Sequence, residues 1–145
     1  MNFWDSSALV PLVIQEDTSR ECRKLFASRQ PAAAWVLSHT EVLSALRRHV
    51  RMGSLTEAGY EQARDGLNRI AARWIEIDAV HEVRSEADRL LSSHPLKAAD
   101  ALQLGAALVA ARVGGENSLG FICLDTDLCT AAAKEGFHVV QPASP

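Results

Sequence analysis

Short apolar segments alternate with longer helical patterns along the whole chain, and this alternation constrains the fold more than any other feature. Strands separated by helices must lie parallel, because parallel neighbours need a crossover connection, and such crossovers are almost always right-handed. The segments with strand character are Phe3–Trp4, Ala32–Leu37, Trp74–Ile77, Leu119–Leu124 and Phe137–Val140. The pattern predicts an α/β fold with three layers, α/β/α, around a central, mostly parallel sheet of four to five strands.

Helical patterns fill the intervals between these strands. They are expected at Ala8–Ile14, 18–29, Ser38–Met52, Thr56–Arg73, Val80–Leu91, Ala98–Val113 and 126–135. The segment Ala98–Val113 is apolar on every side, so we expect it to be buried and closely packed, and any charge within it is conspicuous.

Length and composition place the chain among ordinary globular proteins. Its 145 residues suit one domain spanning 1–145, because single cores typically form in ~100 to 150 residues. A content of 48% hydrophobic and 23% charged residues excludes the disordered and disulfide-stapled classes. The best apolar run is interrupted by Gln103 and Arg112, and Asp5 comes too early for a secretory signal. We therefore expect a cytoplasmic protein with no membrane segment.

Cysteine, histidine and charge add further limits. Cys22, Cys123 and Cys129 have no Cys-x-x-Cys spacing and are interpreted as core residues, and no two histidines lie four residues apart, which disfavours a histidine-bound metal. The net charge of −3 disfavours non-specific adhesion to nucleic acid. However, residues 18–73 carry ten basic and five acidic side chains and residues 74–145 carry five and ten, so two faces of opposite sign are possible.

Four carboxylates lie at or just before the N-termini of predicted helices. Asp5 follows the first strand and Asp125 follows the fourth, while Glu41 and Asp100 each lie in the first turn of a helix. In parallel α/β sheets the carboxyl ends of the strands meet at one edge, and ligands bind there. We therefore look for function at this edge.

Helix capping is the competing explanation for these acids, because carboxylates are favoured at helix N-termini. Ser38-His39-Thr40-Glu41 fits a capping box in which Glu41 accepts from the Ser38 backbone amide. Asp100 is harder to explain in this way, since apolar residues surround it and no Lys or Arg in its helix obviously pairs with it. A buried unpaired carboxylate costs several kcal/mol, so Asp100 needs a cation.

Convergence of the four acids at one edge would predict a divalent metal. Mutual repulsion raises the pKa of clustered carboxylates or demands a counterion, and oxygen-only ligands select hard cations such as Mg²⁺ or Mn²⁺. A carboxylate-bound hard metal activates water and neutralises charge on a phosphodiester. Because the sequence has no nucleophile elbow, dinucleotide fingerprint or phosphate-binding loop, metal-dependent phosphoryl hydrolysis is the chemistry we predict.

The acids belong to four longer segments that together carry a family resemblance. These segments are Asp5–Leu9, Glu41–Arg48, Leu96–Leu104 and Leu124–Leu128 running into Ala131–Ala133 and Gly136. In this order and spacing, over the whole chain, the sequence resembles the PIN-domain ribonucleases, and among them the VapC-type toxins of VapBC toxin–antitoxin pairs.

The resemblance implies an activity and a site. Asp5, Glu41, Asp100 and Asp125 would form the catalytic Mg²⁺ or Mn²⁺ site of an endoribonuclease, and Ser7 would support it near Asp5. The resemblance also implies a homodimer and a cognate VapB-type antitoxin whose C-terminal segment covers the acidic pocket.

Two positions near the last acid are less determined. Asp127 is either an outer carboxylate of the site or a helix N-terminal acid. Similar proteins often carry Ser or Thr two residues before the last acid, where this chain has Cys123, and we expect the missing hydroxyl to weaken the support of Asp125.

Arg47, Arg48 and Arg51 follow Glu41 on the same predicted helix. They could contact RNA phosphates near the metal, because contacts to the backbone position a substrate without reading its sequence. A solvated helix face is an equally good interpretation.

Two other functions stay open. Phe121–Asp127 has the apolar strand and Asp-x-Asp form of the aspartyl-phosphate enzymes, although their motif usually follows the first strand, so one alternative is an aspartyl-phosphate-type phosphatase. The other is an inactive PIN-fold binding module, in which the acids serve only as helix caps.

Overall fold

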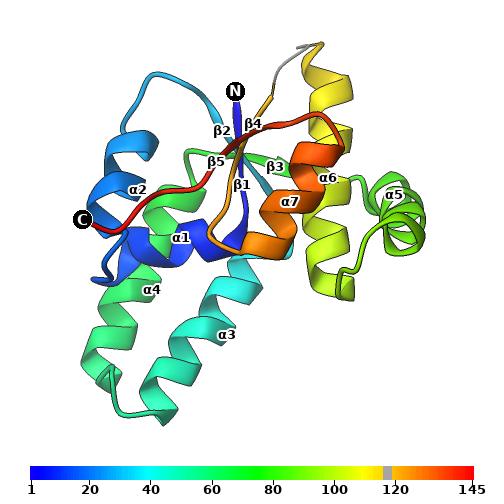
Figure 1. The fold of residues 1–145 in the computed structure, drawn as a ribbon. Coiled ribbons are helices and arrows are strands. Elements are labelled where there is room, and N and C mark those ends of the chain that lie inside the picture. The colour runs from blue at the N-terminus through cyan, green and yellow to red at the C-terminus, as the bar shows by residue number, and fades with distance from the viewer. Residues whose placement is uncertain (116–118) are drawn as a thin grey trace.

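The computed structural model describes residues 1–115 and 119–145, which form a five-stranded sheet between two layers of helices (Figure 1). Every described strand pair is parallel, and the strand order is β3-β2-β1-β4-β5. The strands are β1 (Asn2–Trp4), β2 (Ala32–Trp35), β3 (Ile75–Ile77), β4 (Gly120–Ile122) and β5 (His138–Val140). The predicted α/β class is therefore confirmed, with β1 at the centre of the sheet.

Seven described helices cover the two faces of the sheet. Helices α1 (Ser6–Val13), α2 (Ser19–Phe26), α3 (Ser38–Arg51) and α4 (Glu57–Ala71) enclose one core with the sheet. Helices α5 (Val80–Ser93), α6 (Ala98–Gly114) and α7 (Thr126–Lys134) enclose the other.

Strand residues alternate between these two cores, because successive side chains of a strand point to opposite faces. Phe3 and Phe121 stack with their ring centroids 5.7 Å apart on the side of α5, α6 and α7. Their neighbours Trp4 and Ile122 are buried against α1 to α4. Trp4 and Trp35 are both core residues, which agrees with leaving them out of the predicted site.

Several element boundaries differ from those predicted. Strand β2 ends at Trp35 and not at Leu37, because Leu37 already occupies the N-cap of α3. Likewise, β4 ends at Ile122, before Leu124. Helix α1 begins at Ser6 and not at Ala8, because the Asp5 side chain caps its N-terminus. The strands are shorter than their apolar runs, and the spare residues form the turns at the functional edge.

The apolar helix α6 is buried over its middle turns but not at its ends. Ala101, Leu104 and Ala106 are fully buried, whereas Val113 in the last turn is 82% exposed. None of the described helices has the length and apolar character needed to cross a membrane. All three cysteines are free and buried, as expected.

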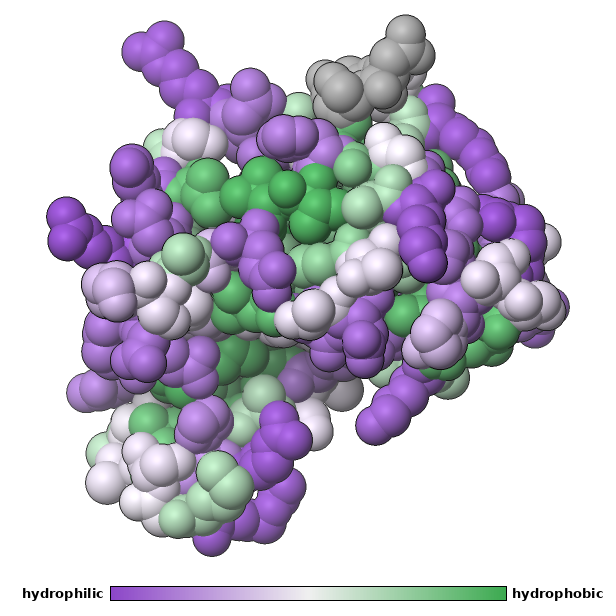
Figure 2. Space-filling model, viewed as in Figure 1, coloured by the Kyte–Doolittle hydropathy of each residue, from purple (hydrophilic) through white to green (hydrophobic). Residues whose placement is uncertain are grey.

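The α3–α4 pair projects beyond the carboxyl ends of the strands (Figure 1). Figure 2 shows hydrophilic side chains over much of this view, around a band of apolar surface, and a hollow beside the projecting pair.

Candidate active site

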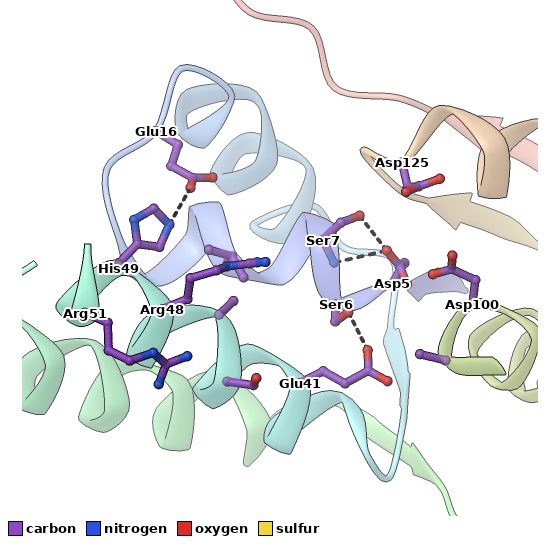
Figure 3. A pocket seen from close by; sticks show the side chains of 14 residues that line it. Asp5, Ser6, Ser7, Glu16, Glu41, Arg48, His49, Arg51, Asp100 and Asp125 are labelled. Atoms are coloured by element: carbon purple, nitrogen blue, oxygen red, sulfur yellow. Dashed lines mark hydrogen bonds and ion pairs between the residues drawn. The ribbon is translucent and has the colours of Figure 1, made fainter. Parts of the chain in front are cut away.

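A cleft of about 530 Å³ opens at the carboxyl ends of the central strands (Figure 3). Its lining includes all four acids singled out in the sequence, which are Asp5, Glu41, Asp100 and Asp125. They come from four different segments: the turn after β1, the first turn of α3, the first turn of α6 and the turn after β4. The parallel sheet brings the acids that follow β1, β2 and β4 to one edge, and the N-terminus of α6 adds Asp100 there.

Asp5 is the deepest of the four carboxylates and is only 3% exposed. Its Oδ2 atom accepts hydrogen bonds from the backbone N–H of Ser7, at 3.0 Å, and from the Ser7 hydroxyl. The Ser7 hydroxyl oxygen in turn accepts from the backbone N–H of Leu124, at 2.9 Å. Ser7 therefore lies beside Asp5 and ties the turn after β1 to the turn after β4.

Burial raises the pKa of Asp5 to about 6, although the Ser7 hydrogen bonds act in the opposite direction. Repulsion from Glu41 and Asp100 adds to the rise. Within residues 1–115 and 119–145, no ion pair or hydrogen bond joins Asp5 to a basic side chain. The negative charge of the buried Asp5 carboxylate is therefore not balanced by a cationic side chain of the described residues.

Glu41 is held by two donors from different elements. Its Oε2 atom accepts from the Ser6 hydroxyl at 2.6 Å and from Nε2 of Gln103 at 2.9 Å. The predicted capping box is wrong, because Leu37 is the N-cap of α3, no side chain caps this end, and the Ser38 hydroxyl hydrogen-bonds with Gln103. Glu41 turns toward the cleft because donors on α1 and α6 compensate its carboxylate there.

Asp100 lies in the first turn of α6 and is half-buried. Burial raises its pKa, and the carboxylates of Asp125 and Glu41 add to the rise, while Lys97 acts against it. The expectation that apolar groups enclose Asp100 holds only in part, because Ala98 and Ala99 are exposed whereas Ala101 is buried. The free-energy cost of burying an unpaired carboxylate is therefore larger at Asp5 than at Asp100.

Asp125 is exposed at the mouth of the cleft and caps α7, its Oδ1 atom accepting from the backbone N–H of Leu128 at 2.9 Å. Asp125 therefore both caps α7 and lines the cleft. Asp127 is exposed in the first turn of α7 and is not part of the cleft lining, although its charge contributes to the raised pKa of Asp100.

The Cys123 thiol fills the space between Asp5 and Asp125, where similar proteins often have a hydroxyl group. Its Sγ atom lies 3.6 Å from Oδ2 of Asp5 and accepts from the backbone N–H of Asp125 at 3.3 Å. Burial raises the pKa of this thiol, so it stays neutral. The thiol thus stands beside both acids.

Protein hydrogen bonds leave one oxygen of each of three carboxylates without a donor in the described residues. In the described residues, Asp5, Glu41 and Asp125 each use a single oxygen to accept protein hydrogen bonds. Within residues 1–115 and 119–145, no three acidic, histidine or cysteine side chains are yet gathered tightly enough to hold a metal ion. The acids therefore surround the cleft without forming a closed coordination sphere.

The opposite end of the cleft is basic. Arg48, His49 and Arg51 of α3 line it, and Arg48 points along the cleft toward the carboxylates (Figure 3). The Nε2 atom of His49 lies 3.5 Å from Oε1 of Glu16, and its Nδ1 atom lies 2.8 Å from the Ser54 hydroxyl.

Arg47 does not belong to this basic end, so its predicted place beside the cleft is wrong. It forms an ion pair with Glu57 at 2.9 Å and stacks over the Tyr60 ring at 3.6 Å from the ring centroid. On a helix, adjacent residues point in directions about 100° apart, so the side chains of Arg47 and Arg48 lie on different faces of α3.

Several polar residues in or behind the cleft were not predicted as site residues, among them Ser6, Glu16, His49 and Gln103. Only Gln103 carried a signal, as the one polar side chain in the middle of an apolar helix. The other three resemble ordinary surface residues in the sequence, and only the packing of α1 against α3 brings them to the cleft.

Known proteins are similar to this chain in sequence and in fold. No protein-family model matches the chain. Two curated proteins of Mycobacterium tuberculosis, ribonuclease VapC45 and ribonuclease VapC49, are each 28% identical to it over 137 residues, which are 94% of this chain and 92% of the relative.

Solved structures share the fold along the whole chain. A toxin–antitoxin complex from Klebsiella pneumoniae has a TM-score of 0.65 at 18% identity, with both chains covered completely. FitAcB from Neisseria gonorrhoeae has a TM-score of 0.66 at 15% identity and 98% coverage of both chains. VapC20 from M. tuberculosis, a sarcin-ricin loop cleaving toxin, has a TM-score of 0.64 at 17% identity and complete coverage.

Proposed function

Because the chain is similar to VapC ribonucleases in sequence and to VapC-type toxins in fold, we propose that it is a PIN-domain ribonuclease toxin that hydrolyses RNA phosphodiester bonds. The observation that carries this proposal is the convergence of Asp5, Glu41, Asp100 and Asp125 on one cleft. None of these acids is close to another in the sequence, so their meeting is a property of the fold.

The chemistry of the donor set fits a divalent cation. Hard oxygen ligands select Mg²⁺ or Mn²⁺. Asp5 is a carboxylate whose pKa is raised by burial, and it forms no ion pair with a basic side chain of the described residues. Asp5, Glu41, Asp100 and Asp125 would hold the ion. When bound, such an ion activates water and neutralises charge on a phosphodiester.

The remaining residues of the cleft position the acids and the substrate. Ser7 and Ser6 orient Asp5 and Glu41 through their hydroxyl groups. Arg48 and Arg51 supply positive charge along the cleft, where they would bind RNA phosphates on one side of the cleaved bond. A guanidinium group suits this role because its planar fork matches the phosphate oxygens.

The two alternatives predict different behaviour. A phosphatase of the aspartyl-phosphate type would leave a phosphoenzyme that acid quenching traps, whereas hydrolysis by water leaves no covalent adduct. In that alternative the nucleophile would be Asp125, the first acid of the Asp-x-Asp motif, and its Oδ1 atom already caps α7. An inactive binding module would use the acids only as caps, yet Glu41 caps no helix and accepts side-chain donors from α1 and α6.

A protein partner follows from the same similarity. One solved structure with this fold is a toxin–antitoxin complex, and we propose a VapB-type antitoxin as the partner of this chain. A basic side chain of such a partner would satisfy the acidic end of the cleft through paired hydrogen bonds.

We also propose a homodimer. An apolar groove of about 320 Å³ beside α5 and α6 exposes Leu37, Val80 and Leu91, each between 44% and 52%. Arg84 and Asp88 also line this groove, so a twofold axis would pair each with its opposite charge on a second copy. Light scattering of the purified chain measures its mass in solution.

RNA cleavage by the purified protein tests the proposed activity. We expect cleavage with Mg²⁺ or Mn²⁺ and none after chelation, and we expect Asp5→Asn and Asp100→Asn each to abolish it while the circular dichroism spectrum stays unchanged. Asp127→Asn, outside the cleft lining, serves as the matched control and should retain activity. Equal cleavage by the wild type and both site variants would exclude the proposed site.

A further inference from the structure

Gln103 is a buried residue whose side-chain amide contacts Glu41 at the acidic end of the cleft. It is 1% exposed in the middle of α6, where its neighbours Leu104, Gly105 and Ala106 are buried as well. Burying an amide costs free energy unless its hydrogen bonds are made, so a glutamine at this position needs specific partners.

Both hydrogens of the Gln103 amide have acceptors. The Nε2 atom donates to Oε2 of Glu41 at 2.9 Å and to the Ser38 hydroxyl at 2.9 Å. The orientation of the amide is fixed by charge, because the opposite orientation would place its oxygen against the Glu41 carboxylate. Gln103 therefore holds Oε2 of Glu41 from the side of α6.

From this geometry we infer that Gln103 is the positioning residue for Glu41, holding the carboxylate so that its free oxygen is available to a divalent cation. This inference rests on the proposed function, since it assigns a role within the same site. Gln103 lies behind Glu41 and is not part of the cleft lining, so it acts only through Glu41.

The Ser6 hydroxyl also positions Glu41, from α1. Ser6 donates to the same Oε2 atom at 2.6 Å, so α1 and α6 clamp one oxygen of Glu41 between them. Partners of this kind behind a metal ligand typically change metal affinity about 10- to 100-fold when removed. Loss of the Gln103 amide leaves the Ser6 bond in place, so we expect an effect near the lower end of that range.

The test measures Mn²⁺ affinity by titration of the metal-free protein, without RNA. Four proteins form a cycle: wild type, Gln103→Met, Glu41→Gln and the double variant. We expect Gln103→Met to weaken Mn²⁺ binding about 10-fold in the wild type and to have almost no effect in the Glu41→Gln background, because interacting sites are not additive. In RNA cleavage, the same variant should lower kcat while KM for RNA stays within about twofold.

Two further variants separate positioning from folding. Val109→Ala weakens the core of the same helix far from Glu41 and should leave Mn²⁺ affinity unchanged. If Gln103→Met alone unfolds, the pair Ser38→Ala and Gln103→Leu replaces both members of the buried hydrogen bond by apolar groups, a change that is close to neutral for folding. This pair is expected to show the same loss of Mn²⁺ affinity.

Three outcomes distinguish the two proposals. Wild-type binding of Mn²⁺ with the expected cycle supports both. Wild-type binding that is unaffected by the Gln103 variants, or equally weakened in the Glu41→Gln background, overturns the positioning role and leaves the proposed function standing. Absence of Mn²⁺ binding by the wild type overturns the metal site and the positioning role together.

Discussion

At the scale of single residues, the Asp5 carboxylate dominates the electrostatics of the cleft. Its pKa rises from 3.8 to about 6 because burial disfavours the charged form. A raised pKa means that the folded protein binds the proton more tightly than the unfolded chain does. The protonated acid therefore contributes stability below about pH 4, and this contribution is lost as the pH rises through about 6.

Asp5→Asn should accordingly make the metal-free protein more stable at neutral pH. Asparagine keeps an oxygen to accept the Ser7 hydrogen bonds but carries no charge, so we expect a gain on the order of 2 to 3 kcal/mol at pH 7.5 and almost none at pH 4. Urea unfolding at the two pH values measures this difference. Asp127→Asn, at an exposed position, is the matched control, and a gain of the same size there would contradict the explanation.

The three arginines of α3 differ in what surrounds them. Arg48 and Arg51 line the cleft, whereas Arg47 is occupied by Glu57 and Tyr60. Arg48→Ala and Arg51→Ala should raise KM for RNA and flatten its dependence on salt, by about 0.7 in the logarithmic slope for each lost phosphate contact. Arg47→Ala should change neither quantity. Equal effects of all three substitutions would show that only the total charge of the helix matters.

At the scale of elements, the close approach of α6 to α5 positions the helix that carries both Asp100 and Gln103. Gly105 makes this approach possible, since a Cβ atom there would meet the Val83 carbonyl oxygen of α5 at 2.8 Å. Gly105→Ala should therefore destabilise the protein by about 1 to 3 kcal/mol, because backbone cannot yield as a flexible side chain can.

A second helical glycine offers the matched control. At Gly66 in α4 an added Cβ would make only ordinary contacts, at 3.7 Å. Gly66→Ala should raise stability by about 0.5 to 1 kcal/mol through the higher helix propensity of alanine. Thermal unfolding of the two variants checks the opposite signs. A stabilising Gly105→Ala would mean that the two helices are less closely packed than described.

Elements were more predictable than their boundaries. The period of apolar residues located most strands and helices of the described residues, because that period reflects which face is buried. It could not locate the ends of β2 and β4, since the residues after Trp35 and Ile122 stay apolar while the chain already turns. The capping box at Ser38 failed for a tertiary reason, because Gln103 and Ser6 provide donors that no local pattern contains.

At the scale of the whole molecule, the strand order β3-β2-β1-β4-β5 brings the acids together. Asp5 and Asp125 follow the neighbouring central strands β1 and β4, and Glu41 follows β2 on the other side. Their positions after strands made this edge predictable from the sequence. The basic end of the cleft was not predictable to the same degree, because it depends on which side of α3 faces α1.

In the proposed function, the two ends of the cleft would serve substrate binding and chemistry separately. Acids gather at the end where the central strands stop, and Arg48 and Arg51 lie at the other end (Figure 3). An RNA strand bound along the cleft would place its phosphates on the arginines and one phosphodiester among the carboxylates. This polarity follows from the opposite charges of the two ends.

The central claim is that four carboxylates from distant segments hold one divalent site. Anomalous diffraction from crystals soaked in Mn²⁺ tests it most directly, because the signal locates the ion without reference to activity. We expect anomalous density between Asp5, Glu41, Asp100 and Asp125, and none there in Asp5→Asn crystals. Density only at other places on a protein that cleaves RNA, or no density in the cleft at saturating Mn²⁺, would contradict the claim.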